Sequence, residues 1–218
     1  MKISDISVEY MDHMGSDCTI VNAARVSFNK EINVMSFNDV KLLQYLAKHR
    51  HWSPFAHTSI QFRCKAPIFL ARQLVKHQVG GVWNEVSRRY VDSAPEFYIP
   101  KVVHNYPQNA KQGCGGEHFF SEYFVGEILA VTKDADSEYN RLIAEGIAPE
   151  EARMVLPLNT MTEWIWTGSL MFWYRVWSLR HDPHAQSAAR EFADLLYKAI
   201  PDDFQSSMQS LVDYYGDV

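Results

Sequence analysis

The chain has 218 residues and a formal net charge of −5, and 47% of its residues are hydrophobic while 22% are charged. These values are typical of a folded globular protein and exclude a disordered chain. The acidic balance argues against a nucleic-acid binder, which needs a surplus of Lys and Arg. The longest apolar region, 164–179, contains Arg175 and is too short to span a bilayer.

The N-terminal segment and the cysteines indicate where the protein works. Residues 1–15 contain acids and lack the apolar core of a signal peptide, so we expect a cytoplasmic protein that does not bind membranes. Cys18, Cys64 and Cys114 are far apart and show no CxxC spacing. This pattern predicts free thiols and supports neither a disulfide framework nor a thiolate zinc site.

Hydrophobic periodicity in the N-terminal half predicts a mixture of strands and helices. Pro67 is placed to open a helix, as proline does in a first turn, and Gly80 and Gly81 are placed to stop it. Asn38 is a candidate helix cap. The expected elements are a strand at 6–11, helices at 21–28 and 38–48, a strand at 57–65 and a helix at 67–78.

The C-terminal half is predicted to be mainly helical. Residues 103–116 are rich in Asn, Gln and Gly and should form a surface loop, whereas the β-branched and aromatic residues at 160–167 favour a strand. No repeat or linker divides the chain, so we expect a single α+β domain over residues 1–218. The expected helices cover 117–145, 149–157, 169–179 and 184–200.

A polar stretch at 76–90, KHQVGGVWNEVSRRY, overlaps the end of the apolar helix predicted from Pro67. Its two glycines let the backbone approach a ligand closely, and consecutive amides in such a loop can bind an anion. Ser87, Arg88 and Arg89 add a hydroxyl and two guanidinium groups that suit phosphate contacts. The stretch predicts a binding site for a phosphate ester; a solvated arginine pair is the alternative.

Several blocks of residues resemble the flavin-dependent thymidylate synthases. HWSPFAHT at 51–58 matches that family's H-x-(S/T)-P-F-x-H, APIFLARQ at 66–73 matches P-(I/V)-F-x-x-R-Q, and NEVSRRY at 84–90 matches N-E-x-S-x-R-Y. Agreement of these blocks in the right order, over roughly residues 50–100 and 150–190, is far more specific than any single motif. The later matching blocks are EFYIP at 96–100, ARMVLPLNTMTEW at 152–164, SLR at 178–180 and HAQ at 184–186.

The resemblance implies a fold and a reaction. The fold is an α+β domain with a mainly antiparallel sheet flanked by helices. The reaction is the reductive methylation of dUMP to dTMP, with methylenetetrahydrofolate as carbon donor, NADPH as reductant and FAD as the hydride carrier between them. Because active sites in that family form between subunits, a homotetramer is implied as well.

The matching positions imply roles for individual residues. Arg180 matches the arginine held against the uracil ring, where its charge would stabilise an enolate-like form, and it is the expected catalytic residue. Ser87 and Arg89 match positions near the nucleotide's phosphate. The positions implied to bind the nucleotide are Gln73, Glu85, Val86, Ser87, Arg88, Arg89, Arg153 and Arg180. The positions implied to bind the flavin are His51, Ser53, Lys76, His77, Gln78, Ser169, Arg175 and Leu179.

The chain departs from the family pattern at flavin-binding positions. Lys76, His77 and Gln78 stand where the family signature reads Arg-His-Arg, which removes one formal charge and both bidentate forks. Ser169 and Arg175 stand where asparagines are common. We therefore hypothesise weaker FAD retention, and a different preferred pyrimidine or a hydroxymethyl product stays open.

Two functions of other classes stay open. The five residues of a candidate metal shell, His51, His57, His181, Asp182 and His184, would suit a metal-dependent phosphohydrolase. A degenerate relative could instead keep the nucleotide pocket without turnover. A bound metal would favour the first function, and nucleotide binding without flavin would favour the second. The family resemblance itself implies no metal site.

Overall fold

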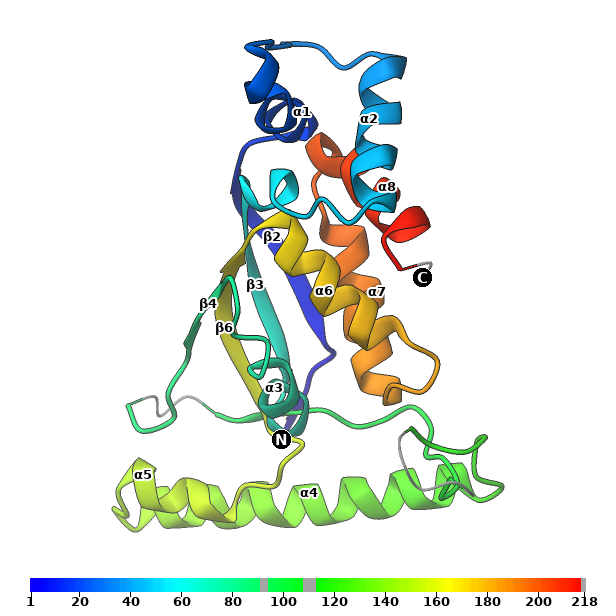
Figure 1. Ribbon diagram of the computed structural model, residues 1–218. Helices are drawn as coiled ribbons and strands as arrows, with labels where there is room; N and C mark the ends of the chain where they lie inside the picture. The colour runs from blue at the N-terminus through cyan, green and yellow to red at the C-terminus, as the bar shows by residue number, and fades with distance from the viewer. Residues whose placement is uncertain (91–93, 108–112, 217–218) are drawn as a thin grey trace.

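The computed structural model describes residues 1–90, 94–107 and 113–216. An antiparallel sheet in the order β2-β3-β6-β4 forms the centre of the molecule (Figure 1). Its strands are β2 (Ser7–Met14), β3 (Ser59–Pro67), β6 (Met161–Gly168) and β4 (Gly81–Glu85). Two short strands, β1 (Lys2–Ile3) and β5 (Glu96–Phe97), pair in parallel. The predicted α+β class with a mainly antiparallel sheet is confirmed.

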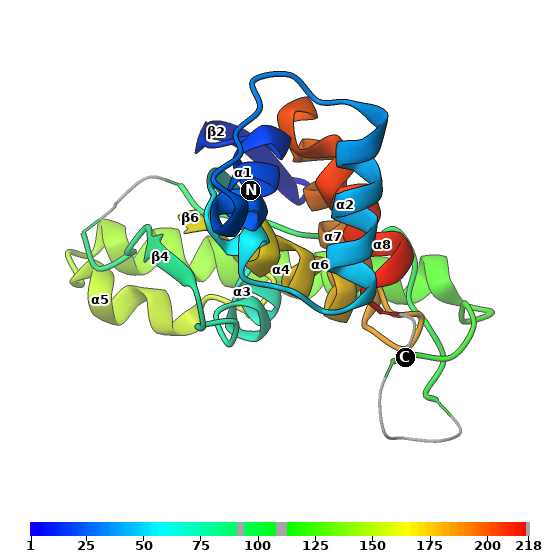
Figure 2. The same cartoon turned by 45° about the horizontal axis from the view of Figure 1, so that its top comes forward.

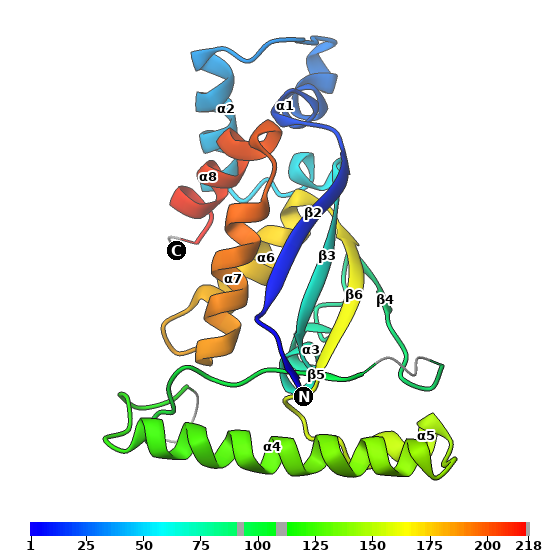
Figure 3. The same cartoon turned by 180° about the vertical axis from the view of Figure 1, so that it is seen from behind.

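The core lies on one face of this sheet. Alternate residues of β3 are buried, and Phe62 and Cys64 lie opposite Trp166 and Trp164 of β6. Large aromatic side chains bury much area each, so these pairs contribute strongly to stability. Two helices pack on this face, α6 (Leu170–His181) and α7 (Ser187–Ala199), as the view from behind shows (Figure 3).

Further helices cover the two ends of the sheet. Figure 1 shows the long helix α4 running past one end, with α5 beside it, while α1, α2 and α8 gather at the other. In Figure 2 the end that holds α1, α2 and α8 is turned toward the viewer. None of the described helices combines the length and apolarity that a bilayer span requires. The bounds of these helices are α1 (Asp17–Arg25), α2 (Phe37–Lys48), α4 (Ser121–Ala144), α5 (Pro149–Ala152) and α8 (Gln205–Tyr214).

The helix expected at 67–78 is shorter than predicted, because α3 spans Ile68–Leu74. The chain then turns at Gly80, which has φ +84°, and enters β4 at Gly81. A Cβ on Gly81 would lie 2.4 Å from the Phe172 ring, and one on its strand partner Gly168 would lie 2.2 Å from it. The predicted glycine loop is therefore confirmed at Gly80, which lies in a turn, and wrong at Gly81, which starts an edge strand on which an aromatic ring packs.

Several other boundaries differ from prediction. Ser36, rather than Asn38, caps α2. The helix expected at 149–157 ends early and continues as a 3-10 turn, Arg153–Val155, and α8 was not predicted. Residues 108–112 of the predicted loop lie outside the described residues. The three cysteines are unpaired, as predicted.

Candidate functional site

A cleft of about 480 Å³ opens beside the end of β4, and we call it the β4 cleft. Its walls come from β4 and the turn that follows, from the start of β6 and from the 3-10 turn after α5. Segments far apart in the sequence thus meet at one place. Five residues predicted to bind the nucleotide line the cleft together: Glu85, Val86, Ser87, Arg88 and Arg153.

Two of these residues can donate hydrogen bonds to a ligand. The Oγ atom of Ser87 accepts from the backbone N of Arg89 at 3.4 Å and from its Nε at 3.3 Å, so the hydroxyl hydrogen stays available. The Nε of Arg153 donates to the Glu150 carbonyl oxygen at 3.1 Å, which orients the guanidinium. Arg89 lies outside the lining of the cleft, with its guanidinium 4.9 Å from the Tyr90 ring centroid. The cleft thus suits an anionic group.

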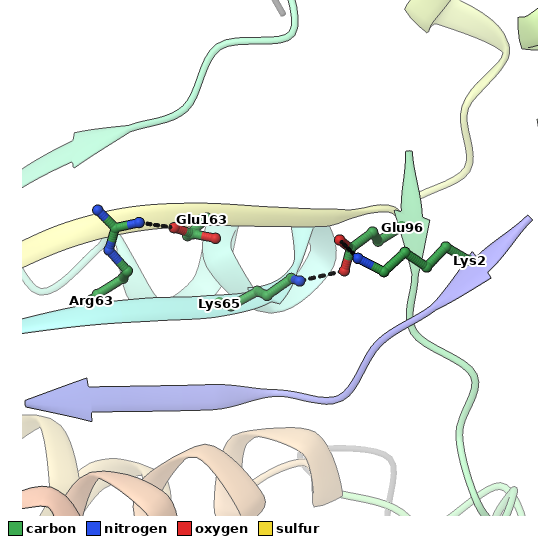
Figure 4. Close-up of polar contacts among 5 residues, drawn as sticks. All are labelled: Lys2, Arg63, Lys65, Glu96 and Glu163. Carbon is green, nitrogen blue, oxygen red and sulfur yellow. Dashed lines mark hydrogen bonds and ion pairs between the residues drawn. The ribbon is translucent and has the colours of Figure 1, made fainter. Parts of the chain in front are cut away.

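Two of the three carboxylates that line the β4 cleft are neutralised by cations from neighbouring strands (Figure 4). Glu96 accepts from Lys2 at 2.6 Å and from Lys65, and these hydrogen bonds lower the pKa of Glu96 to about 2. Glu163 pairs with Arg63 at 2.7 Å. Both acids therefore repel an anion less than isolated carboxylates would. The sequence motifs assigned no role to Lys65 or Glu96, although strand alternation places Lys65 on the same face of β3 as Arg63.

A second cavity, of about 460 Å³, lies beside α6, and we call it the α6 cavity. Gln73, Leu179 and Arg180 line it. The Nε of Arg180 donates to Nε2 of His77 at 3.1 Å, so His77 carries its hydrogen on Nδ1. Burial and then the charge of Arg180 lower the pKa of His77 to about 4, so the ring is neutral at pH 7. Burial also lowers the pKa of Arg180, which stays charged near neutrality.

Gln73, which lines the α6 cavity, carries an unused hydrogen-bond acceptor. Its Oε1 atom is buried and has no hydrogen-bond partner within the described part of the chain. A buried amide oxygen without a partner is costly, so this atom fits a donor group supplied by a ligand. The predicted nucleotide residues are thus divided between two cavities, with Gln73 and Arg180 in one and Ser87 and Arg153 in the other.

The predicted flavin residues are spread over the segment before β3, the turn after α3 and the length of α6. Lys76 and Gln78 are exposed just after α3. The Arg175 guanidinium lies 5.9 Å from the ring centroid of Trp52, which is half exposed. His51 is exposed next to Trp52, and Leu179 lies in the α6 cavity.

Two serines of the predicted flavin set lie at the ends of short elements. The Oγ of Ser169 accepts from the backbone N of Phe172 at 3.2 Å and caps α6. Ser53 precedes a 3-10 turn, Pro54–Ala56. In the same motif the buried Thr58 hydroxyl donates to the Phe55 carbonyl at 3.3 Å and accepts from the Leu170 amide at 3.0 Å. Thr58, the last residue of HWSPFAHT, therefore holds the start of α6 in place.

The candidate metal shell is not assembled. His181 pairs with Asp194 at 3.0 Å, while His184 pairs with Asp182 at 2.9 Å. No group of three or more His, Cys, Asp or Glu side chains within 1–90, 94–107 and 113–216 is arranged to hold a metal ion. The phosphohydrolase hypothesis gains no support from this geometry.

Comparisons with known proteins agree on one family. The family model described as thymidylate synthase complementing protein matches residues 9–203. A flavin-dependent thymidylate synthase of Thermotoga neapolitana is 35% identical over 95% of this chain and 91% of its own length. A relative with the same description from Thermus thermophilus is 37% identical over 88% of this chain and 70% of its own.

Solved structures give the same result. The chain is similar to a UMP/dUMP methylase, PolB from Streptomyces cacaoi, bound with 5-Br dUMP, with a TM-score of 0.86 and 31% identity over 98% of each chain. A structure of the same methylase bound with 5-Br UMP matches with a TM-score of 0.85 and 30% identity, over 98% of this chain and 97% of that one.

Proposed function

This chain belongs to the thymidylate synthase complementing protein family, and we propose that it methylates dUMP to dTMP in the cytoplasm. Methylenetetrahydrofolate would supply the carbon, NADPH the electrons, and FAD would carry hydride between them. The observation that carries this proposal is the meeting of Glu85, Ser87 and Arg153 in the β4 cleft, because the family resemblance assigns all three to the nucleotide.

The β4 cleft supplies the groups that the nucleotide's phosphate needs. Ser87 donates its hydroxyl hydrogen, since its oxygen already accepts from Arg89. Arg153 offers terminal guanidinium nitrogens, because its Nε is held by the Glu150 carbonyl. Such charge-assisted bonds are roughly twice as strong as neutral ones, so the phosphate end should dominate nucleotide affinity.

Arg180 supplies the activation of the pyrimidine ring. Carbon–carbon bond formation at C5 requires electron density there, which places negative charge on the ring's carbonyl oxygens. A guanidinium held in a partly buried site stabilises that charge without reorganising. His77 fixes the Nε side of Arg180 and leaves its terminal nitrogens for the ring, while the free Oε1 of Gln73 can accept a ring N–H.

The residues present also fit a flavin dinucleotide. Lys76 and Arg175 supply positive charge for its diphosphate, and Trp52 exposes an aromatic surface beside Arg175. When bound, the flavin supplies hydride transfer to the one-carbon unit. The protein's part is to hold the rings in contact and to exclude water.

The division of the predicted residues between two cavities supports assembly into a homotetramer. In the proposed oligomer the β4 cleft of one subunit would be completed by the α6 cavity of another. Apolar side chains on and just before α4 are exposed, which favours contact with a second copy. They are Phe119, Phe120, Tyr123, Phe124 and Val131. Light scattering after size-exclusion chromatography measures the mass of the assembly.

A direct test uses purified protein with FAD, NADPH, methylenetetrahydrofolate and either dUMP or UMP, followed by mass spectrometry of the nucleotide product. We expect dTMP from dUMP, and Arg180→Lys should lower the rate about 100-fold or more, as loss of an oriented donor does. Arg141→Lys on the exposed face of α4 is the control. A hydroxymethyl product, preference for UMP or no turnover would each overturn part of the proposal.

A further inference from the structure

Glu85 is held at both carboxylate oxygens by neutral donors. The Thr162 hydroxyl donates to Oε1 at 2.6 Å, and the Trp83 indole N–H donates to Oε2 at 3.2 Å. Thr162 also lines the β4 cleft with Glu85. Each carboxylate oxygen has two acceptor positions, so both oxygens can still accept a further hydrogen from a ligand. The two donors thus fix the orientation of the Glu85 carboxylate, and with it the direction from which a ligand can donate a hydrogen bond.

The indole that holds Glu85 is itself fixed by the tryptophans of the core. The Trp83 ring stacks on Trp164 with centroids 4.1 Å apart and an interplanar angle of 18°, and it meets the edge of Trp166 at 5.0 Å. Both partners are about 1% exposed. An indole packed on two buried rings has little rotational freedom, so its N–H is a fixed donor.

We propose that Trp83 and Thr162 are positioning residues that orient the Glu85 carboxylate toward a hydrogen donor on the nucleotide. This inference rests on the proposed function, because it assumes that the β4 cleft binds a pyrimidine nucleotide. Ser87 and Arg153 bind the anionic end of that ligand, so Glu85 recognises a donor on its neutral part, a sugar hydroxyl or a ring N–H. A freely rotating carboxylate on an edge strand would lose affinity to rotamer entropy.

The test measures dUMP binding by isothermal titration calorimetry, and steady-state turnover, for Thr162→Val and Trp83→Phe. Each variant removes one donor: valine keeps the volume of threonine, and phenylalanine keeps an aromatic ring. We expect the Kd of dUMP to rise about 5- to 30-fold for each, as for a hydrogen bond to a charged group. KM should rise by a similar factor with kcat nearly unchanged. Thr162→Ser, which restores the hydroxyl, should recover most of the affinity.

A double-mutant cycle shows whether the two residues act through Glu85. In a Glu85→Ala background, Thr162→Val should weaken dUMP binding by less than two-fold, because the group it orients is gone. Val82→Ala, an exposed neighbour on the same strand, is the matched control, and circular dichroism checks folding. If Trp83→Phe fails to fold, Thr162→Val carries the test.

Two results would overturn the inference while leaving the proposed function standing. One is a Thr162→Val variant that binds dUMP with wild-type affinity. The other is a Thr162→Val substitution that weakens dUMP binding by the same factor in the wild-type and the Glu85→Ala backgrounds. By contrast, a wild-type protein that binds no dUMP would refute the proposed function itself, so the two failures are distinguishable.

Discussion

Arg180 donates its Nε hydrogen to Nε2 of a neutral His77 at a distance of 3.1 Å. The two residues are separated by 103 positions, and each was predicted to act separately, one on the pyrimidine and one on the flavin. The contact shows that one side of the Arg180 guanidinium is fixed before any ligand binds. Burial is the main reason that the pKa of His77 is lowered, and the contact adds to it, because a proton on Nε2 would bring two positive groups together.

Acid should destabilise the protein through His77. The folded-state pKa of about 4 lies below the ordinary 6.5, so between these values the unfolded chain binds a proton that the folded chain does not. The resulting stability is fully present above pH 6.5 and is lost as the pH falls toward 4. His77→Gln should remove this contribution to the pH dependence of the free energy of unfolding. The contribution is less than about 1.4 kcal/mol per pH unit, because the ring is only half buried.

Urea unfolding at successive pH values between 7.5 and 4.5 measures that effect. His49→Gln, at an exposed histidine after α2, is the control and should keep the wild-type profile. An unchanged profile in His77→Gln would show that another group carries the acid sensitivity.

Arg153→Ala should weaken binding of dUMP but not of deoxyuridine. If Arg153 binds the phosphate, its loss removes a charge-assisted bond worth roughly 1.5–3 kcal/mol, or about 10- to 100-fold in Kd. Competition calorimetry with both ligands separates the phosphate from the nucleoside. Arg141→Ala, an exposed arginine paired with Glu138 on α4, should leave both affinities unchanged. Equal weakening of both ligands would place Arg153 at the nucleoside instead.

Gln78→Arg should tighten FAD binding. The substitution adds a positive charge and a bidentate donor at an exposed position that the family resemblance assigns to the flavin, and about 10-fold is expected from one such contact. Quenching of flavin fluorescence measures the Kd. Gln205→Arg, at the exposed start of α8, adds the same charge elsewhere and should have no effect. If Gln78→Arg binds FAD no better, the variant signature does not weaken flavin retention.

Alanine at Gly81 or Gly168 should destabilise the protein by about 1–3 kcal/mol, because the new Cβ would overlap the ring of Phe172. Urea unfolding measures the change. Gly126→Ala, in α4 with nothing within 4 Å of its Cβ, should instead be neutral or slightly stabilising. Adding Phe172→Leu should recover part of the loss in Gly81→Ala, and no recovery would mean that backbone strain, rather than the ring, sets the cost.

Sequence alone determined the elements whose signals are local. The alternation in β3 and the helical periodicity around α2, α4, α6 and α7 depend on neighbours a few residues apart, so these elements were predicted with small errors at their ends. The residue types in NEVSRRY likewise indicated a phosphate site, and the structure places Ser87 and Arg88 in a cleft with Arg153.

The tertiary structure decided what distant segments do together. Gly80 and Gly81 looked like a helix stop, yet Gly81 begins β4 opposite Gly168, and the lack of a Cβ at both glycines leaves room for the ring of Phe172, far along the chain. Lys65 reaches Glu96, Thr162 reaches Glu85 and His77 reaches Arg180 only after the sheet and α6 have packed. Periodicity reports which face of an element is buried, but it carries no record of which side chain lies opposite across the fold. Those partners are set by strand register and helix packing, and they give the site its geometry.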